Sequence, residues 1–174
     1  MTETFEIMLM GGHPNSLGRT VEVVDHVLAE PARLEELFVC YSSEDDVVRL
    51  RVSSAMKRVE VARHDLLLPY IDRFIDQIGQ LDQPSAQWTL AILFEKLRPD
   101  MTASQESSSL ALLKRNLAEN DDWIVLNTTM DVLARWSKGN AALSGWFAPH
   151  LKRLAKDPRK SVSKKAAKLM SAAA

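Results

Sequence analysis

Apolar residues recur along this chain with the spacing of a helix surface and not of a strand. Five segments follow the pattern i, i+4, i+7, i+11, which places four side chains on one face of an α-helix. They start at Leu17, Val48, Ala86, Val125 and Val162. Alternating β-branched runs and Asn-Gly or Asp-Gly turns, which are typical of hairpins, are missing from the sequence. The pattern predicts an all-α protein.

A second series of apolar segments lies between the first ones. It follows i, i+3, i+4, i+7 and starts at Leu34, Ile71, Leu110 and Phe147. Both series repeat after about 38 residues, and such a period is typical of two-helix units that bury their apolar faces against their neighbours. The sequence therefore predicts four two-helix repeats after an N-terminal half-repeat.

The turns inside these units carry a motif that can be compared with a known family. Residues 157–162 read Asp-Pro-Arg-Lys-Ser-Val, and residues 46–49 read Asp-Val-Val-Arg. This arrangement resembles the HEAT repeat, in which two antiparallel helices are joined by a turn of the type Asp-Pro-x-x-x-Val-Arg. The resemblance covers residues 17–173 and implies a right-handed, armadillo-like α-solenoid. Pro84 falls later than the proline of the family turn, and the third turn has no proline.

The same pattern suggests how the chain is organised. We expect residues 1–16 to form a flexible N-terminal segment and residues 17–174 to form a single HEAT-like domain. The single cysteine, Cys40, rules out a disulfide framework. No apolar run approaches the roughly 18 residues of a membrane-spanning helix, and the first ten residues contain no basic cluster. The expectation is a cytoplasmic protein without a membrane partner.

Charge is distributed unevenly along the chain, although the formal net charge is only −1. Residues 149–174 carry eight Lys and Arg side chains against one Asp, a net charge of +7, whereas residues 1–148 carry 14 basic and 22 acidic side chains. A basic end on an acidic body can attract an acidic protein or a nucleic acid. The alternative is a terminal helix whose lysines keep it soluble.

The helices of the first series also predict a candidate binding surface. Offsets of +3, +6 and +10 from the first apolar residue fall on the face away from the buried side. In HEAT arrays these helices line the concave surface, so the resemblance implies a concave basic stripe made of Arg51, Arg58, Lys96, Arg135, Lys165 and Lys168. The alternative is ordinary solubility combined with i, i+4 ion pairs such as Asp131 with Arg135.

The sequence gives little support for a catalytic site. The glycine-containing segment 11–19 lacks the Lys-Ser/Thr ending of a phosphate loop, which favours a flexible entry into the first helix. The four histidines form no metal-binding pair, so neither a metal nor another cofactor is expected. Cys40 is interpreted as a small buried hydrophobe and His150 as a partly buried core residue.

The four tryptophans have a structural and a functional interpretation. Trp136 belongs to a predicted core segment, and packing between repeats is the favoured interpretation for Trp88, Trp123 and Trp146. Some HEAT-like proteins are DNA glycosylases that act on alkylated bases with concave-face Trp and Asp residues. Asp122-Trp123 resembles that combination in composition only.

These observations favour a non-enzymatic scaffold that presents a concave groove to a protein or another acidic partner. The alternative is a nucleic-acid-binding HEAT-like protein, with a DNA alkylation-repair glycosylase as its enzymatic extreme. A catalytic role is the less favoured interpretation.

Overall fold

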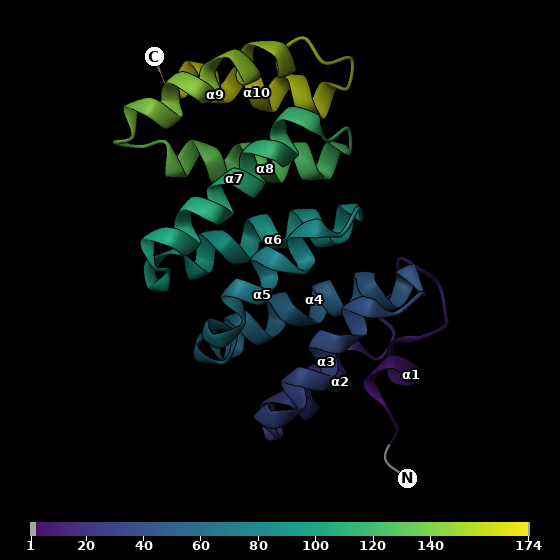
Figure 1. The fold of residues 1–174 in the computed structure, drawn as a ribbon. Coiled ribbons are helices and arrows are strands. Elements are labelled where there is room, and N and C mark those ends of the chain that lie inside the picture. Colours follow the sequence, from purple (N-terminus) through teal and green to yellow (C-terminus); the bar gives the residue numbers. More distant parts are fainter. Residues whose placement is uncertain (1–2, 174) are drawn as a thin grey trace. The chain divides into compact units, whose positions relative to one another are not determined.

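The structure is a computed structural model that describes residues 3–173, and within this range it is helical and contains no strand (Figure 1). This confirms the all-α prediction. The chain divides into two compact units, residues 1–105 (unit 1) and residues 106–174 (unit 2).

Unit 1 contains six α-helices within its described residues. Their bounds are α1 Phe5–Leu9, α2 Thr20–Ala29, α3 Leu34–Val39, α4 Asp46–Ala62, α5 Ile71–Asp76 and α6 Pro84–Leu97. Short 3-10 turns flank several of them, at Pro31–Arg33, Cys40–Ser42, His64–Tyr70, Ile78–Gln80 and Arg98–Asp100.

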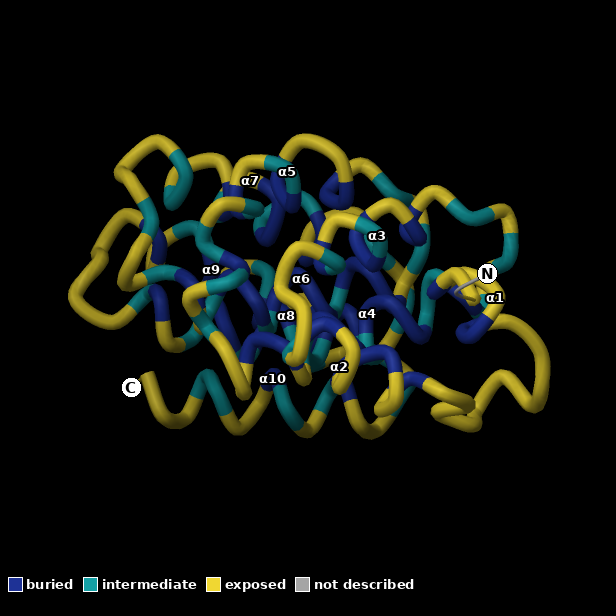
Figure 2. The backbone as a smooth tube through the Cα atoms, turned by 90° about the horizontal axis from the view of Figure 1, so that it is seen from below, coloured by how far each residue is buried: buried dark blue, intermediate teal, exposed yellow. Residues whose placement is uncertain are grey.

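The centre of unit 1 is α4, which packs against α2 on one side and α6 on the other. The predicted apolar face of α4 is fully buried and consists of Val48, Val52, Ala55 and Val59. The corresponding face of α6 is also buried and consists of Ala86, Leu90, Leu93 and Leu97. The dark-blue stretches of both helices mark this core in Figure 2. The spacing of apolar residues therefore gave the correct buried face for both helices.

Helices α3 and α5 are shorter than the apolar pattern suggests, and 3-10 turns continue them. The four predicted positions of each helix are nevertheless buried. An aromatic cluster joins them, because the ring of Phe38 lies 5.5 Å from that of Phe74 and 5.2 Å from that of Tyr70. The apolar face of each helix therefore continues from the α-helix into the 3-10 turn that follows it.

The first predicted helix begins later than expected. Leu17 and Val21 are 43% and 47% exposed, whereas Val23, Val24 and Val27 form the buried face of α2. The reason lies in the backbone, since Gly18 has a φ of +51° and a right-handed helix cannot continue through that conformation. The prediction of Leu17 and Val21 as core residues is wrong.

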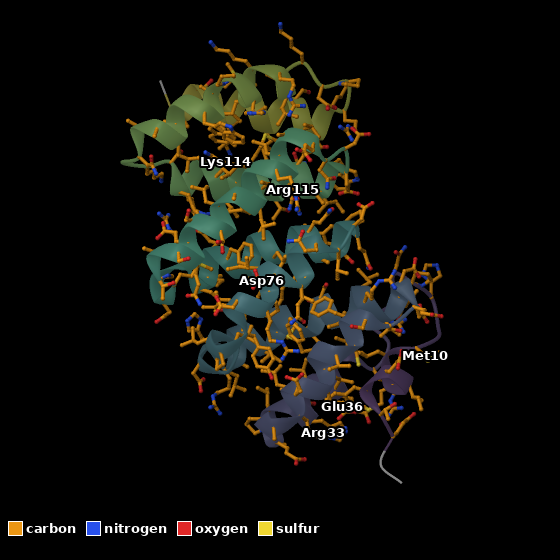
Figure 3. All side chains as sticks on the ribbon, in the orientation of Figure 1. Met10, Arg33, Glu36, Asp76, Lys114 and Arg115 are labelled. Atoms are coloured by element: carbon orange, nitrogen blue, oxygen red, sulfur yellow. The ribbon has the colours of Figure 1, made fainter. Side chains whose placement is uncertain are left out.

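The N-terminal segment contributes to the core of unit 1. Helix α1 buries Phe5, Met8 and Leu9, which precede the predicted start of the domain at residue 17. Two residues labelled in Figure 3 hold it: Glu36 accepts a 2.8 Å hydrogen bond from the backbone N–H of Phe5, and the Arg33 guanidinium lies 3.9 Å from the centre of the Phe5 ring.

Unit 2 contains the larger part of α7 (Ala103–Glu119), followed by α8 (Trp123–Trp136), α9 (Ala141–Leu154) and α10 (Lys160–Ala172). Helix α10 packs against α8 and α9. The predicted core segment of α8, including Trp136, is buried as expected. On α10 only the first two predicted positions, Val162 and Ala166, are buried, and Ala173 is exposed because the helix has already ended.

Candidate functional site

Arg51 on α4 organises the N-terminal loop of unit 1, here defined as residues 10–19. Its side chain is 2% exposed. The guanidinium donates hydrogen bonds of 2.6 Å to the carbonyl oxygens of Leu9 and Gly11, and of 3.1 Å to those of His13 and Ser16. The prediction of Arg51 as part of an exposed basic stripe is therefore wrong. Its physical role is to replace the hydrogen bonds that a folded-back loop would otherwise lack.

The loop approaches this guanidinium closely because it contains glycine at the contact points. A Cβ atom on Gly18 would lie 2.9 Å from Arg51 Cζ, and one on Gly12 would lie 3.6 Å from Arg51 Nη2. Gly11, Gly12 and Gly18 all have positive φ angles. The sequence contains both partners of this contact, the loop glycines and an arginine beside the apolar face of α4. Helix spacing does not relate a loop to a helix that follows it, so the contact between them could not be predicted.

A cavity of about 330 Å³ lies beside the buried arginine. Its walls are loop residues 14–17, a face of α4 that includes Arg51, Ser54 and Lys57, and Trp88 with Thr89 on α6. All of these residues belong to unit 1. The cavity joins a segment near residue 15 to one near residue 88, so helix periodicity alone could not have revealed it.

The cavity is electrostatically positive. Its lining residues include the cations Arg51 and Lys57 and no carboxylate. Partial burial, together with the neighbouring charge of Arg58, lowers the pKa of the Lys57 ammonium below its usual range. Thr89 is 1% exposed, and its hydroxyl oxygen is buried without a hydrogen-bond partner. A buried donor and two cations without a counter-charge are thus gathered at one place.

The remaining predicted cations of unit 1 stand at the surface. Arg58 on α4 and Lys96 on α6 are exposed, and neither forms an ion pair within residues 3–173. Both follow the cavity residues by one to two helical turns on their own helices, since Arg58 is four residues after Ser54 and Lys96 is seven after Thr89.

The predicted cations of unit 2 differ in their surroundings. Arg135 and Lys168 are exposed, whereas Lys165 is partly buried and forms an ion pair with Asp131 of α8. A continuous stripe through the other five predicted cations, Arg58, Lys96, Arg135, Lys165 and Lys168, stays a prediction.

Helix α10 carries a row of exposed lysines in unit 2. Lys160, Lys164 and Lys168, the α10 lysine row, are four residues apart and exposed, and none of them forms an ion pair among the described residues. Arg159 next to this row behaves differently, because it pairs with Asp157 and Asp121 at 2.8 Å and 3.1 Å. Its neighbour Asp157 consequently has its pKa lowered to about 2.

A second cavity, of about 460 Å³, lies within unit 2. Phe147, Leu151 and Leu169 supply much of its apolar wall, and its charged lining residues are Asp131, Arg135 and Lys138. The lining of this cavity therefore includes a carboxylate, whereas that of the cavity in unit 1 includes none.

The residues considered for catalysis have structural roles. Asp122 caps α8, because its Oδ1 accepts hydrogen bonds of 2.8 Å and 3.0 Å from the backbone N–H groups of Ile124 and Val125. Cys40 is buried as predicted, and this burial raises the pKa of its thiol to about 12. A thiol with that pKa is a poor nucleophile at neutral pH.

Trp123 and His150 differ in how far they are buried. Trp123 is 50% exposed, so the prediction that it packs between repeats is wrong. Trp123 is the first residue of α8, directly after its cap Asp122. His150 is partly buried as predicted and stacks on Trp146 with ring centres 4.2 Å apart. Burial and the nearby Arg153 lower the pKa of this imidazole.

No group of three or more His, Cys, Asp or Glu side chains that could hold a metal ion occurs in the described part of the chain. No helix within it has the length and apolar character needed to cross a bilayer. Comparison with models of protein families, with curated proteins and with solved structures gave no match.

Proposed function

We propose that this protein is a non-enzymatic, HEAT-like helical scaffold that binds an acidic protein through its exposed cations. The period of about 38 residues and the buried apolar faces of α4, α6 and α8 support a repeat architecture. In this proposal the two-helix units stack into a right-handed solenoid with a concave groove.

The observation that carries the proposal is the α10 lysine row. Successive members are separated by about 6 Å along the helix axis, since each residue rises 1.5 Å. Their charges are not neutralised by neighbouring carboxylates. Unit 2 as a whole carries 12 basic and six acidic side chains. A surface of this kind attracts an acidic partner and increases the rate of encounter.

A scaffold role agrees with how the reactive side chains are used. Asp122 is a helix cap, and the Cys40 thiol is buried with a raised pKa. His64 is held between Glu60 and Asp100 at 2.9 Å on each side. Each of these groups contributes to the fold at its own position.

Nucleic-acid binding is the second candidate, and one observation favours it. Trp123 is half exposed in the unit that carries the α10 lysine row, and exposed aromatic rings next to cations can stack on unpaired bases. A glycosylase would be the enzymatic form of this candidate. The proximity of Asp122 to Trp123 supports it weakly, because the Asp122 carboxylate already caps α8.

The test compares binding of a fluorescent Glu-rich peptide and of generic duplex and single-stranded DNA by anisotropy at low salt. The variant K160E/K164E/K168E reverses the charges of the α10 lysine row. It should weaken peptide binding by at least about tenfold, because three attractive interactions with the acidic peptide become repulsive. The matched control K160R/K164R/K168R keeps the charge and should bind as the parent does. Circular dichroism checks that both variants stay helical.

Two results would contradict the proposal. Equal peptide affinity of the parent and the charge-reversed variant would exclude the α10 lysine row as the binding surface. Binding of DNA but not of the peptide, with an affinity that falls steeply with salt, would favour the second candidate. The variant R58E/K96E tests in the same assay whether the exposed cations of unit 1 contribute.

A further inference from the structure

We propose that the cavity of unit 1 is a binding site for a small organic phosphate, held between Arg51, Lys57 and Thr89. This inference is independent of the acidic-partner proposal, because it concerns a different unit and different side chains.

Arg51 contributes a positive charge whose hydrogen-bond partners are neutral carbonyl oxygens. A guanidinium has five N–H donors, and four hydrogen bonds to neutral carbonyl oxygens leave one Nη2 hydrogen unused. Those carbonyls satisfy the donors but supply no negative charge. A buried cation without a counter-ion is costly, and an anion in the adjacent cavity would reduce that cost.

Lys57 adds another cation to the same cavity. Its side chain is partly buried, and Arg58 rather than a carboxylate is its charged neighbour. Both influences lower the pKa of the ammonium, because burial and a like charge disfavour its positive form. A bound anion would stabilise the charged form of Lys57.

Thr89 on α6 also lines the cavity. This residue is 1% exposed in the wall of the cavity, and its oxygen has no hydrogen-bond partner. Buried hydroxyls are normally paired, because an unpaired one costs about 1–3 kcal/mol. Rotation of the Thr89 side chain toward the cavity would let this hydroxyl donate to a ligand with several acceptor oxygens. Ser54 and Ser16 place further hydroxyl groups around the same space.

The number of cations favours phosphate over carboxylate. A phosphate monoester carries a charge of about −1.5 to −2 at neutral pH and three acceptor oxygens, which suits two cations and several hydroxyls. A volume of about 330 Å³ is near the lower limit of ligand cavities, which measure roughly 300–1,000 Å³. Trp88 and Leu50 provide apolar wall for the organic part of such a molecule.

The experiment titrates the full chain with phenyl phosphate and follows heat of binding and tryptophan fluorescence. Replacing Lys57 by Met keeps the alkyl chain and removes the charge, so K57M should raise the dissociation constant by at least about tenfold, or 1.4 kcal/mol. K96M removes an exposed cation that does not line the cavity and should change the constant by less than about twofold. T89V, which replaces the hydroxyl by a methyl group of similar size, should weaken binding by less than K57M does.

The outcomes separate this proposal from its alternatives. Binding that is equal in the parent and K57M, or undetectable in the parent at millimolar phenyl phosphate, would overturn the site. Benzoate that binds as tightly as phenyl phosphate would overturn the preference for phosphate. Inorganic phosphate alone, binding as tightly as the phenyl ester, would show that the apolar wall is not used. The variant K160E/K164E/K168E should bind phenyl phosphate normally, so failure of the acidic-partner proposal leaves this result unaffected.

Discussion

At the scale of single residues, Arg51 shows how one side chain can fix a loop and shape a cavity. Its guanidinium binds four carbonyl oxygens between Leu9 and Ser16, and the same loop supplies residues 14–17 to the cavity wall. An Arg on the flank of an apolar helix face usually extends to the solvent. Here the loop folds over it, so that its charge is enclosed.

We expect R51M to destabilise unit 1 by about 2–4 kcal/mol, because four charge-assisted hydrogen bonds are lost and their carbonyls remain. Urea unfolding followed by circular dichroism measures this change. R58M on the same helix removes an exposed cation and should cost at most about 0.5 kcal/mol. Equal losses of unfolding free energy in R51M and R58M would show that the loop is not held by Arg51.

Alanine substitutions at Gly18 and Gly11 distinguish the effect of backbone strain from that of a side-chain clash. Both glycines have positive φ angles, of +51° and +72°, but a Cβ at Gly18 would lie 2.9 Å from Arg51 whereas one at Gly11 would meet no atom within 4 Å. G18A should therefore lower the melting temperature more than G11A, whose cost is limited to the left-handed backbone. Equal shifts in the two variants would mean that the Arg51 guanidinium moves freely out of the way.

At the scale of elements, the apolar spacing predicted the helices well where packing is two-sided. Helix α4 lies between α2 and α6, and all four of its predicted core positions are buried. The same pattern was less reliable for α2 and α10. Leu17 precedes α2 because the backbone at Gly18 has a positive φ angle, and the last predicted position, Ala173, follows the end of α10.

The cavity of unit 1 could not be predicted in the same way. Trp88 was interpreted as a packing residue, and Lys57 and Thr89 did not stand out from their helices. What makes them a site is that residues 14–17 fold against α4 and α6, a contact between segments more than 30 residues apart. Helix periodicity specifies which face of a helix is buried but not which loop covers the rest of it.

His64 links the end of α4 to the Arg98–Asp100 turn and should make the stability of unit 1 depend on pH. Hydrogen bonds with Glu60 and Asp100 raise the pKa of its imidazole. Its contribution is therefore fully present below the unfolded-state pKa of about 6.5 and is lost as the pH rises through the raised folded-state pKa. We expect the difference in melting temperature between the parent and H64Q to be larger at pH 6 than at pH 8.5.

The control for this prediction removes one of the two partners. D100N keeps His64 and Glu60 but leaves a single carboxylate beside the imidazole, so its pH-dependent difference from the parent should be smaller than that of H64Q. A difference that is the same at pH 6 and pH 8.5 for H64Q would show that His64 contributes through packing and not through its charge.

At the scale of the whole molecule, a formal net charge of −1 conceals two units of opposite sign. Unit 1 contains 10 basic and 17 acidic side chains, and unit 2 contains 12 basic and six acidic ones. A net charge near zero gives little mutual repulsion between copies of a protein. Oppositely charged units add an attraction between unit 1 of one copy and unit 2 of another.

We therefore expect weak self-association at low ionic strength that disappears as salt is added. The screening length is about 30 Å at 0.01 M salt and about 8 Å at 0.15 M, so attraction between exposed charges acts over the size of a unit only in the first case. Static light scattering should give a negative second virial coefficient at low salt and a value near zero or above at the higher concentration. K160E/K164E/K168E lowers the positive charge of unit 2 by six and should remove most of the attraction, whereas the charge-preserving triple Arg variant should keep it. Attraction that persists unchanged in the Glu variant would point to apolar contacts, because those do not depend on the α10 lysine row.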